Sequence, residues 1–422
     1  MILGASPEAF VWRVPSRRRH DHKKTMLCRF HTPTNNGNDG AFPSKKPKQA
    51  SGYQTPSQIN PIMLNIKKSM NLVAIVMALQ IGSAHTPVCA GEAASTTVLN
   101  TVAFGACAAQ TKPQTIWDAI VATDPDLFLF IGDNIYGDTE DPSVLKRKYA
   151  QLAAKPGYQN LLKTCPLLST WDDHDYGKND GGEEYVMREE SAEIFLDFFN
   201  VPQDSPRRSR AGIYGAQTFG EAGKRVQVIL LDTRYFRSSP MVENTISKQE
   251  KRKKNLVGWY VPTTNTDTTI LGAEQWAWLE KQLEEDADVR IIASSIQVVS
   301  QEKGMECWGN FPHERKRLFD LIQTTKANGV VFISGDVHFS EISVDTTGPY
   351  PLYDFTSSGM THSGKAWSRA VNSLRVGNAY SGLNFGLISM DWANQSLTLE
   401  SKSAEGETVI QNDLLLSDLM VK

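Results

Sequence analysis

The chain has 422 residues, of which 40% are hydrophobic and 22% are charged, and this composition is typical of a soluble globular protein. The net charge of −3 hides an asymmetry, because residues 1–69 carry 12 Lys and Arg against 3 Asp and Glu, whereas residues 70–422 carry 32 against 44. Since the positive charge lies in the tail, the composition argues against nucleic acid as a partner of the folded part.

The first 90 residues have the pattern of an extension followed by a secretory signal. Residues 1–69 are rich in Pro, Asn, Ser, Gln and Lys and show no periodic apolar pattern, so we expect a disordered extension or a wrongly assigned start. Residues 70–90 contain an apolar run, 72–82, that follows two lysines and precedes small residues at 88 and 90, as in a cleavable signal peptide. The run is too short to span a bilayer. We therefore expect a secreted, periplasmic or extracellular protein, with an uncleaved membrane anchor as the alternative.

From residue 98 onward, short apolar runs typical of buried strands alternate with helical patterns. Strands are expected at 98–104, 126–131, 166–170, 226–231, 289–293 and 330–334. Helices are expected at 113–121, 144–154, 188–199, 272–287 and 313–328. The C-terminal third adds expected antiparallel strands at 352–357, 385–391, 396–401 and 408–412. This alternation predicts an α/β domain with layered sheets.

One segment interrupts the alternation. Residues 238–270 contain the charge run KQEKRKK at 248–254, several Thr and Asn, and few apolar residues. We expect a surface insertion near the functional site, within one domain that covers residues 91–422, rather than a boundary between two domains.

Four of the predicted strands run directly into side chains that can bind metal. The segments are FGAC at 104–107, GDNIY at 132–136, WDDHD at 171–175 and GDVH at 335–338. Because the loops beyond the carboxyl ends of strands converge on one crevice in an α/β sheet, these side chains are expected to lie together. Closely packed carboxylates repel one another unless a cation lies between them. The sequence therefore predicts a metal centre.

These motifs, together with LDTR at 231–234, resemble the PhoD-like alkaline phosphatase and phosphodiesterase family of the calcineurin-like metallophosphoesterase superfamily. The resemblance covers roughly residues 98–360. It implies a layered α/β sandwich of two mixed β-sheets flanked by helices. It also implies an exported phosphoester hydrolase that acts on small-molecule or polymeric phosphomonoesters, phosphodiesters or both.

The resemblance also implies a set of metal ligands. Asp133 would bridge two metal ions. The other ligands of the first ion would be Cys107, Tyr136 and His338, and a thiolate, a phenolate and an imidazole suit Fe(III). The second ion would be held by the oxygens of Asp173 and Asp336, which suit Ca²⁺, with Mn²⁺ or Mg²⁺ as alternatives. Further candidates at the site are Asp172, Gln297 and Asn310.

The implied reaction is direct in-line attack on phosphorus by a metal-held hydroxide. His174 is the expected donor of a proton to the leaving oxygen, and its alternative role is that of a structural histidine; in both cases Asp175 would hold it. Arg234 is expected to bind phosphate oxygens through its guanidinium, with an internal salt bridge to Asp232 as the alternative. The competing functions are a catalytically silent metal-binding or phosphate-sensing protein and a dimetal hydrolase of some other ester.

Overall fold

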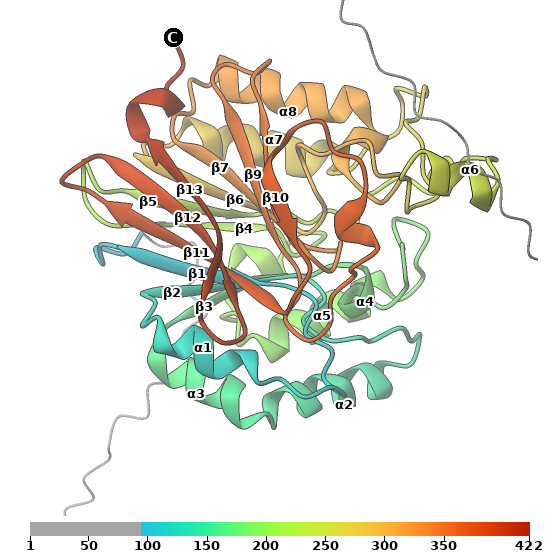
Figure 1. The fold of residues 1–422 in the computed structure, drawn as a ribbon. Coiled ribbons are helices and arrows are strands. Elements are labelled where there is room, and N and C mark those ends of the chain that lie inside the picture. The colour runs from blue at the N-terminus through green and yellow to red at the C-terminus, as the bar shows by residue number, and fades with distance from the viewer. Residues whose placement is uncertain (1–93) are drawn as a thin grey trace, which may run out of the picture. The chain divides into compact units, whose positions relative to one another are not determined.

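The computed structural model describes residues 94–422, which are coloured in Figure 1. The predicted extension and signal peptide, residues 1–90, lie outside the described residues. Within residues 94–422, no helix has the length and apolar character needed to cross a membrane.

The first of two β-sheets contains six strands and carries three of the four predicted ligand segments. Its strands are β1 (Thr101–Gly105), β2 (Leu127–Ile131), β3 (Leu167–Thr170), β11 (Asn384–Asp391), β12 (Ser396–Ser403) and β13 (Thr408–Leu415). The order is β13-β12-β11-β1-β2-β3, in which β1, β2 and β3 run parallel and the remaining pairs are antiparallel. The carboxyl ends of the three parallel strands therefore lie at the same edge.

The second sheet contains seven strands. They are β4 (Gly215–Phe219), β5 (Val226–Leu230), β6 (Val289–Ser294), β7 (Val330–Ser334), β8 (Ser340–Asp345), β9 (Leu352–Ser357) and β10 (Arg375–Tyr380). The order is β10-β8-β9-β7-β6-β5-β4, with a parallel centre of β9, β7, β6 and β5 and antiparallel strands at both edges. Both sheets are therefore mixed.

Helices cover the outer faces of this pair of sheets (Figure 1). Beside the six-stranded sheet lie α1 (Ile116–Ala122), α2 (Pro142–Ala153), α3 (Pro156–Thr164) and α5 (Arg188–Phe198). Beside the seven-stranded sheet lie α7 (Gly272–Glu284) and α8 (Pro312–Thr324). Two short helices, α4 (Asp173–Tyr176) and α6 (Lys248–Lys253), lie in loops, and single 3-10 turns occupy 206–208, 308–310, 367–369 and 416–419.

Two hydrophobic clusters hold these layers together. In the first, side chains of the two sheets meet, and the rings of Phe104 from β1 and Phe355 from β9 form an edge-to-face pair with centroids 4.9 Å apart. In the second, Trp117 of α1 packs against Phe128 and Phe130 of β2. Burial of such large side chains on both faces of the central strands holds the ends of those strands in place.

The predicted fold class is confirmed, because two mixed sheets lie between layers of helices. The elements that the sequence did not indicate include α3, β4, β8 and β10. Strand β10 has no buried residue, and β4 buries alternate residues only, so neither has the continuous apolar run by which the central strands were identified. In the segment 238–270, α6 is the one helix and no residue belongs to a named strand.

Candidate metal centre

The predicted strand ends meet at one edge of the two sheets. Cys107, Asp133 and Asp172 follow β1, β2 and β3, which are neighbours in the six-stranded sheet. Asp336 and His338 follow β7 of the other sheet. Parallel strands present their carboxyl ends at a common edge, which is why residues far apart in the sequence come together here.

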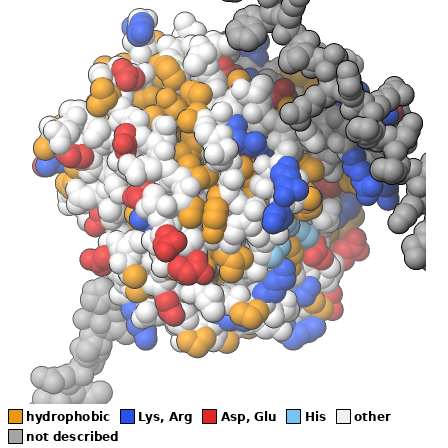
Figure 2. All heavy atoms as spheres, viewed as in Figure 1, with side chains coloured by type: hydrophobic (Ala, Val, Ile, Leu, Met, Phe, Trp, Pro, Cys, Tyr) orange, Lys and Arg blue, Asp and Glu red, His pale blue; other side chains and the backbone are white. Residues whose placement is uncertain are grey.

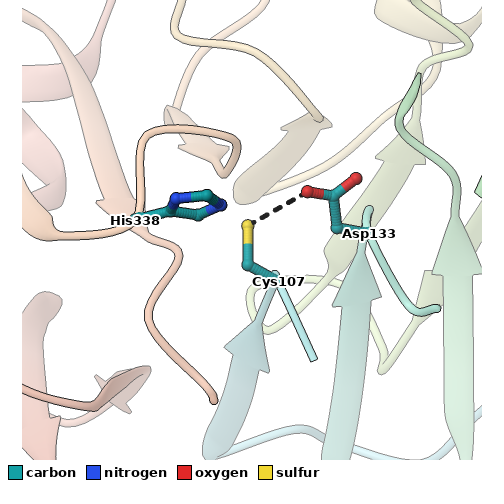
Figure 3. A group of neighbouring side chains, drawn as sticks. All are labelled: Cys107, Asp133 and His338. Carbon is teal, nitrogen blue, oxygen red and sulfur yellow. Dashed lines mark hydrogen bonds between the residues drawn. The ribbon is translucent and has the colours of Figure 1, made fainter. Parts of the chain in front are cut away.

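A first cluster forms around the carboxylate of Asp133 (Figure 3). Its Oδ2 accepts hydrogen bonds from Cys107 Sγ at 3.3 Å and from Tyr136 Oη at 3.2 Å. Tyr136 Oη also lies 3.1 Å from His338 Nε2. The potential ligand atoms of Cys107, Asp133 and His338 all lie within 4.8 Å of one another. Atoms bound to a common metal ion at ~2.0–2.3 Å have separations of this size, so this donor set fits a transition metal.

A second cluster contains oxygen donors only. Carboxylate oxygens of Asp172, Asp173 and Asp336 lie within 4.8 Å of one another. Asp133 connects the two clusters, because it has a potential ligand atom within 4.8 Å of those of Cys107 and His338 and also one within 4.8 Å of those of Asp173 and His174. No donor in the described part of the chain reaches Asp172 Oδ2, which is buried. An oxygen-rich site with an unsatisfied buried carboxylate oxygen fits a hard cation.

Burial and neighbouring charges raise the pKa of several groups in these clusters. Burial and the charge of Asp173 raise the pKa of Asp133 well above its ordinary value. Burial and the charge of Asp172 do the same to the pKa of Asp336. Burial and Asp133 also raise the pKa of the Cys107 thiol. Because a cation bound here would favour the ionised forms, metal binding is expected to release protons.

The backbone of the ligand loops is strained. Cys107, Asp133, Asp336 and His338 all have positive φ angles, at 63°, 50°, 67° and 54°. Such conformations are uncommon for residues other than glycine and cost of order 1–3 kcal/mol each. All four of these positive φ angles occur at candidate ligands. The packing of the sheets therefore holds these residues in conformations that are locally unfavourable.

His174 lies at the edge of the centre, and its hydrogen-bond partner differs from the prediction. Its Nδ1 donates to Asp138 Oδ1 at 2.7 Å. Burial lowers the pKa of His174, but the hydrogen bond to Asp138 and the charges of Asp133 and Asp173 raise it to about 11. The expected partner, Asp175, instead accepts hydrogen bonds from the backbone of Asp172 and from the Asn134 side chain. The prediction that Asp175 orients His174 is therefore wrong.

Arg234 is a buried cation paired with two carboxylates. Its guanidinium contacts Asp172 and makes two hydrogen bonds to Glu306, at 2.9 and 2.7 Å, and its side chain has no exposed surface. The guanidinium nitrogens expected to bind phosphate oxygens are paired here with the carboxylates of Asp172 and Glu306. The alternative salt bridge also differs from the prediction, since Asp232 accepts from the backbone N–H of Arg234 rather than from its guanidinium.

Gln297 and Asn310 do not present free ligand atoms to either cluster. Gln297 accepts from Lys303 Nζ at 2.9 Å and donates to Glu341 at 2.9 Å, so its amide belongs to a buried network beside the centre. Asn310 donates to the backbone oxygen of Met305 at 3.0 Å and contacts Cys307 Sγ through Oδ1. The candidacy of these two amides as ligands is therefore not supported by their positions.

Four residues near the centre were not identified from the sequence. They are Asp138, Asp180, Glu306 and His362. Carboxylate oxygens of Asp173, Asp180 and Glu306 lie within 4.8 Å of one another, and His362 Nε2 lies 3.0 Å from Tyr136 Oη. The one signal for His362 was the scarcity of histidine beyond residue 90, where the chain has four.

The centre opens into a pocket of about 200 Å³ that is rich in acids. The acidic residues that line it are Asp133, Asp173, Asp180, Glu306 and Asp336. No Lys or Arg is among the described residues of the lining. Its wall also carries Trp259, Tyr260 and Trp367. On the face shown in Figure 2, histidine atoms reach the molecular surface beside Lys or Arg side chains.

Comparisons with known proteins give matches in sequence and in fold. The model of a family described as PhoD-like phosphatase matches residues 102–372. Alkaline phosphatase D of Bacillus subtilis (strain 168) is 24% identical over 215 residues, which are 46% of this chain and 35% of that protein. The matched segment thus spans about a third of the length of that relative. A solved structure titled "Structure of PhoD" aligns with a TM-score of 0.59 and 18% identity, covering 76% of this chain and 69% of that one, and so supports the fold.

Proposed function

Since the chain belongs to the PhoD-like phosphatase family, we propose that it is a metal-dependent phosphoester hydrolase for phosphomonoesters, phosphodiesters or both. The observation that carries this proposal is the charge of the pocket. Its lining contains five carboxylates and, among the described residues, no Lys or Arg. A phosphate group would be repelled there unless cations compensated both its own charge and that of the acids.

We assign the ligands by the chemistry of the two clusters. Asp133 would serve both ions, because it belongs to a group with Cys107 and His338 and to another with Asp173 and His174. The remaining ligands of the first ion would be Cys107, Tyr136 and His338, a set that suits Fe(III). The second ion would be held by Asp173 and Asp336, and also by Asp172 through its unpartnered oxygen. Ca²⁺ suits this oxygen-only set, with Mn²⁺ or Mg²⁺ as alternatives.

When bound, two such ions lower the pKa of water and neutralise charge on phosphoryl oxygens. The chain itself supplies the proton for the leaving group. His174 lines the pocket, and its Nδ1–H is held by Asp138, so Nε2 is left as the atom that delivers a proton. The hydrogen bond to Asp138 favours the protonated imidazole, which is the state that a general acid needs.

We further propose a single displacement with no covalent enzyme intermediate. The described pocket lining contains no Ser, Thr, Cys or Lys. Carboxylates and imidazoles can also act as nucleophiles, but here Asp133, Asp173, Asp336 and His338 are assigned to the metal ions and His174 to proton transfer. The two other acids of the lining are paired, Asp180 with Tyr260 and Glu306 with Arg234. Hydrolysis should therefore invert the configuration at a chiral phosphorus atom. Retention of configuration would require an enzyme nucleophile and would contradict this step.

The pocket wall favours an organic leaving group. Trp259 is 49% exposed although it lines the pocket, and Trp367 stacks on the imidazole of His338 with 4.9 Å between ring centroids. Such aromatic surfaces gain stability by covering apolar or planar groups. Trp259 belongs to the segment 238–270, which we propose as a surface insertion that shapes the substrate site.

We propose that the protein is exported. The support is the signal-like segment 70–90, with a cleavage position after Ala90. Expression of the whole chain followed by N-terminal sequencing of secreted material tests this. A mature protein that begins at Gly91 is expected, and retention of an intact segment in the membrane fraction would favour the anchor.

The activity is tested with a chromogenic phosphomonoester and a chromogenic phosphodiester, with metals quantified in the same samples. We expect turnover of at least one ester, loss of turnover after chelation, and recovery when Fe(III) and Ca²⁺ are restored. A protein that binds metals without turnover would be the silent alternative. Turnover that survives complete metal removal would refute the metal-dependent mechanism.

A further inference from the structure

His362 has no role in the ligand set assigned above, yet its ring points into the first cluster. It lies in the loop after β9, and its Nε2 is 3.0 Å from Tyr136 Oη and 3.1 Å from His338 Nε2. Tyr136 Oη is itself 3.1 Å from His338 Nε2. Three potential ligand atoms from three separate loops therefore form a nearly equilateral triangle.

The hydrogen bonds of Thr361 determine which nitrogen of His362 carries the proton. The Thr361 hydroxyl donates its single proton to the backbone oxygen of Cys107 at 2.9 Å. The hydroxyl oxygen of Thr361 in turn accepts from the backbone N–H of Ala109 at 2.9 Å. Because this proton is already used, the 2.9 Å contact between Thr361 Oγ1 and His362 Nδ1 requires the imidazole to donate. The neutral ring is then protonated at Nδ1 and carries a lone pair at Nε2.

This lone pair faces the atoms already assigned to the first metal ion. Tyr136 has one hydroxyl proton and lies within hydrogen-bond distance of Asp133, His338 and His362, so that proton satisfies at most one of them. Metal-binding histidines characteristically donate their other ring N–H to a fixed acceptor, which orients the lone pair toward the metal. Thr361 has that place here, and its hydroxyl also ties the loop to the backbone of Cys107.

We propose that His362 is a further ligand of the first metal ion, bound through Nε2, with Thr361 as its positioning residue. This inference rests on the metal centre of the proposed function. It adds a second imidazole to a thiolate, a phenolate and a carboxylate. Such a set favours a transition metal over Ca²⁺ at this position.

Co²⁺ provides the test, because its visible spectrum reports coordination number and its hyperfine shifts identify bound imidazoles. In the wild-type protein loaded with Co²⁺ after metal removal, proton NMR should show two solvent-exchangeable, hyperfine-shifted N–H signals from the first site. One would come from His338 and one from His362. His362→Ala should lose one of these signals, bind Co²⁺ at least tenfold more weakly at that site, and show a changed visible spectrum.

His313→Ala is the matched control, because His313 binds the backbone oxygen of Thr268 at 2.6 Å and lies outside both clusters. It should leave Co²⁺ affinity and both signals unchanged. Thr361→Val should retain the second imidazole ligand but weaken Co²⁺ binding by ~10–100-fold, the usual effect of removing a partner of a ligand. Thr361→Ser should restore the affinity.

The outcomes separate this inference from the proposed function. A wild-type protein that takes up no Co²⁺ overturns the metal centre and the inference with it. A wild-type protein that binds Co²⁺ at the first site with a single shifted imidazole N–H overturns the inference alone. The same holds if His362→Ala keeps the wild-type affinity and spectrum while turnover falls, since His362 would then act on the substrate. If His362→Ala does not fold, the wild-type NMR spectrum decides.

Discussion

The hydrogen bond from His174 to Asp138 gives a prediction that separates charge from orientation. Asp138→Asn removes the negative charge but retains an oxygen that accepts from Nδ1–H of His174. Position 138 has φ 43°, and asparagine tolerates this left-handed conformation as well as aspartate does. The substitution therefore leaves the backbone unchanged, whereas Asp138→Ala removes both the charge and the acceptor.

The size of the effect follows from the 2.7 Å contact and from its exposure. An opposite charge this close raises a pKa by ~1–3 units. The Asp138 side chain is 42% exposed, so solvent screening reduces the effect to the lower end of that range. We expect Asp138→Asn to lower the pKa of His174 by about one unit, or ~1.4 kcal/mol. The protonated imidazole is the active acid, so activity falls as the pH rises through the pKa of His174. In the variant, this alkaline limb should lie about one pH unit lower than in the wild type.

The assay measures kcat against pH for two esters, one with an alkyl alcohol and one with a nitrophenol as leaving group. Nitrophenolate leaves without protonation, so the shift of the alkaline limb should appear with the alkyl ester and shrink with the nitrophenyl ester. Asp138→Ala should lower kcat for the alkyl ester by a further ~10-fold, because general acid catalysis contributes ~10²–10⁴ in all. Asp320→Asn, which removes an exposed carboxylate paired with Lys316, is the control. An unshifted alkaline limb, or equal losses with both esters, would refute the role given to His174.

Three other substitutions test the centre and its surroundings. Cys107→Ser should lower the transition-metal content and reduce turnover more than 100-fold, whereas Cys165→Ser, the control at another buried free cysteine, should change neither. Metal analysis and turnover assays of both variants measure this. Full metal content in Cys107→Ser would contradict the assignment of Cys107 as a ligand. Glu341→Gln leaves the buried Lys303 without its 2.6 Å partner and should lower the free energy of unfolding by ~3 kcal/mol at pH 7. Burial would raise the pKa of Glu341, but Lys303 and Arg375 hold that pKa below its ordinary value. The wild type should therefore lose stability as the pH falls below about 4.5, and the variant should lose less. Urea unfolding at pH 7 and pH 4 measures the difference. Arg234→Lys should lower the free energy of unfolding by ~2–3 kcal/mol with little change in KM, because a lysine ammonium cannot pair with both Asp172 and Glu306 as the planar guanidinium does. A KM raised more than tenfold at unchanged stability would instead indicate that Arg234 binds substrate.

The sequence predicted the parts of the fold and site that local pattern determines. The β1 and β2 strands are continuous apolar runs, and their ends place Cys107 and Asp133 without reference to any other part of the chain. The partners of His174 and Arg234 could not be predicted in this way. Asp138 is 36 residues from His174, and Glu306 is 72 residues from Arg234, so each pairing depends on how loops cross above the sheets.

His362 shows the same limit. It contacts Tyr136 across 226 residues, from a segment that has no strand or helical periodicity. Its orientation depends on the hydroxyl of its neighbour Thr361, which reaches the backbone of Cys107 across 254 residues. Sequence reasoning identifies residue types that bind metal, but the choice among them requires the contacts between distant loops.

The left-handed ligand loops have a consequence for protein engineering. At Asp336, a costly φ of 67° coincides with a carboxyl group whose pKa burial and Asp172 raise. Asparagine accepts that backbone conformation and carries no charge, so Asp336→Asn relieves the repulsion and should raise the melting temperature of the metal-free protein while weakening the metal centre. Selection for heat resistance alone would therefore enrich substitutions that inactivate the protein, which is the trade-off expected where function maintains unfavourable local structure. A stabilisation programme for this chain should leave the ends of β1, β2 and β7 unchanged and look for its gains in the helices.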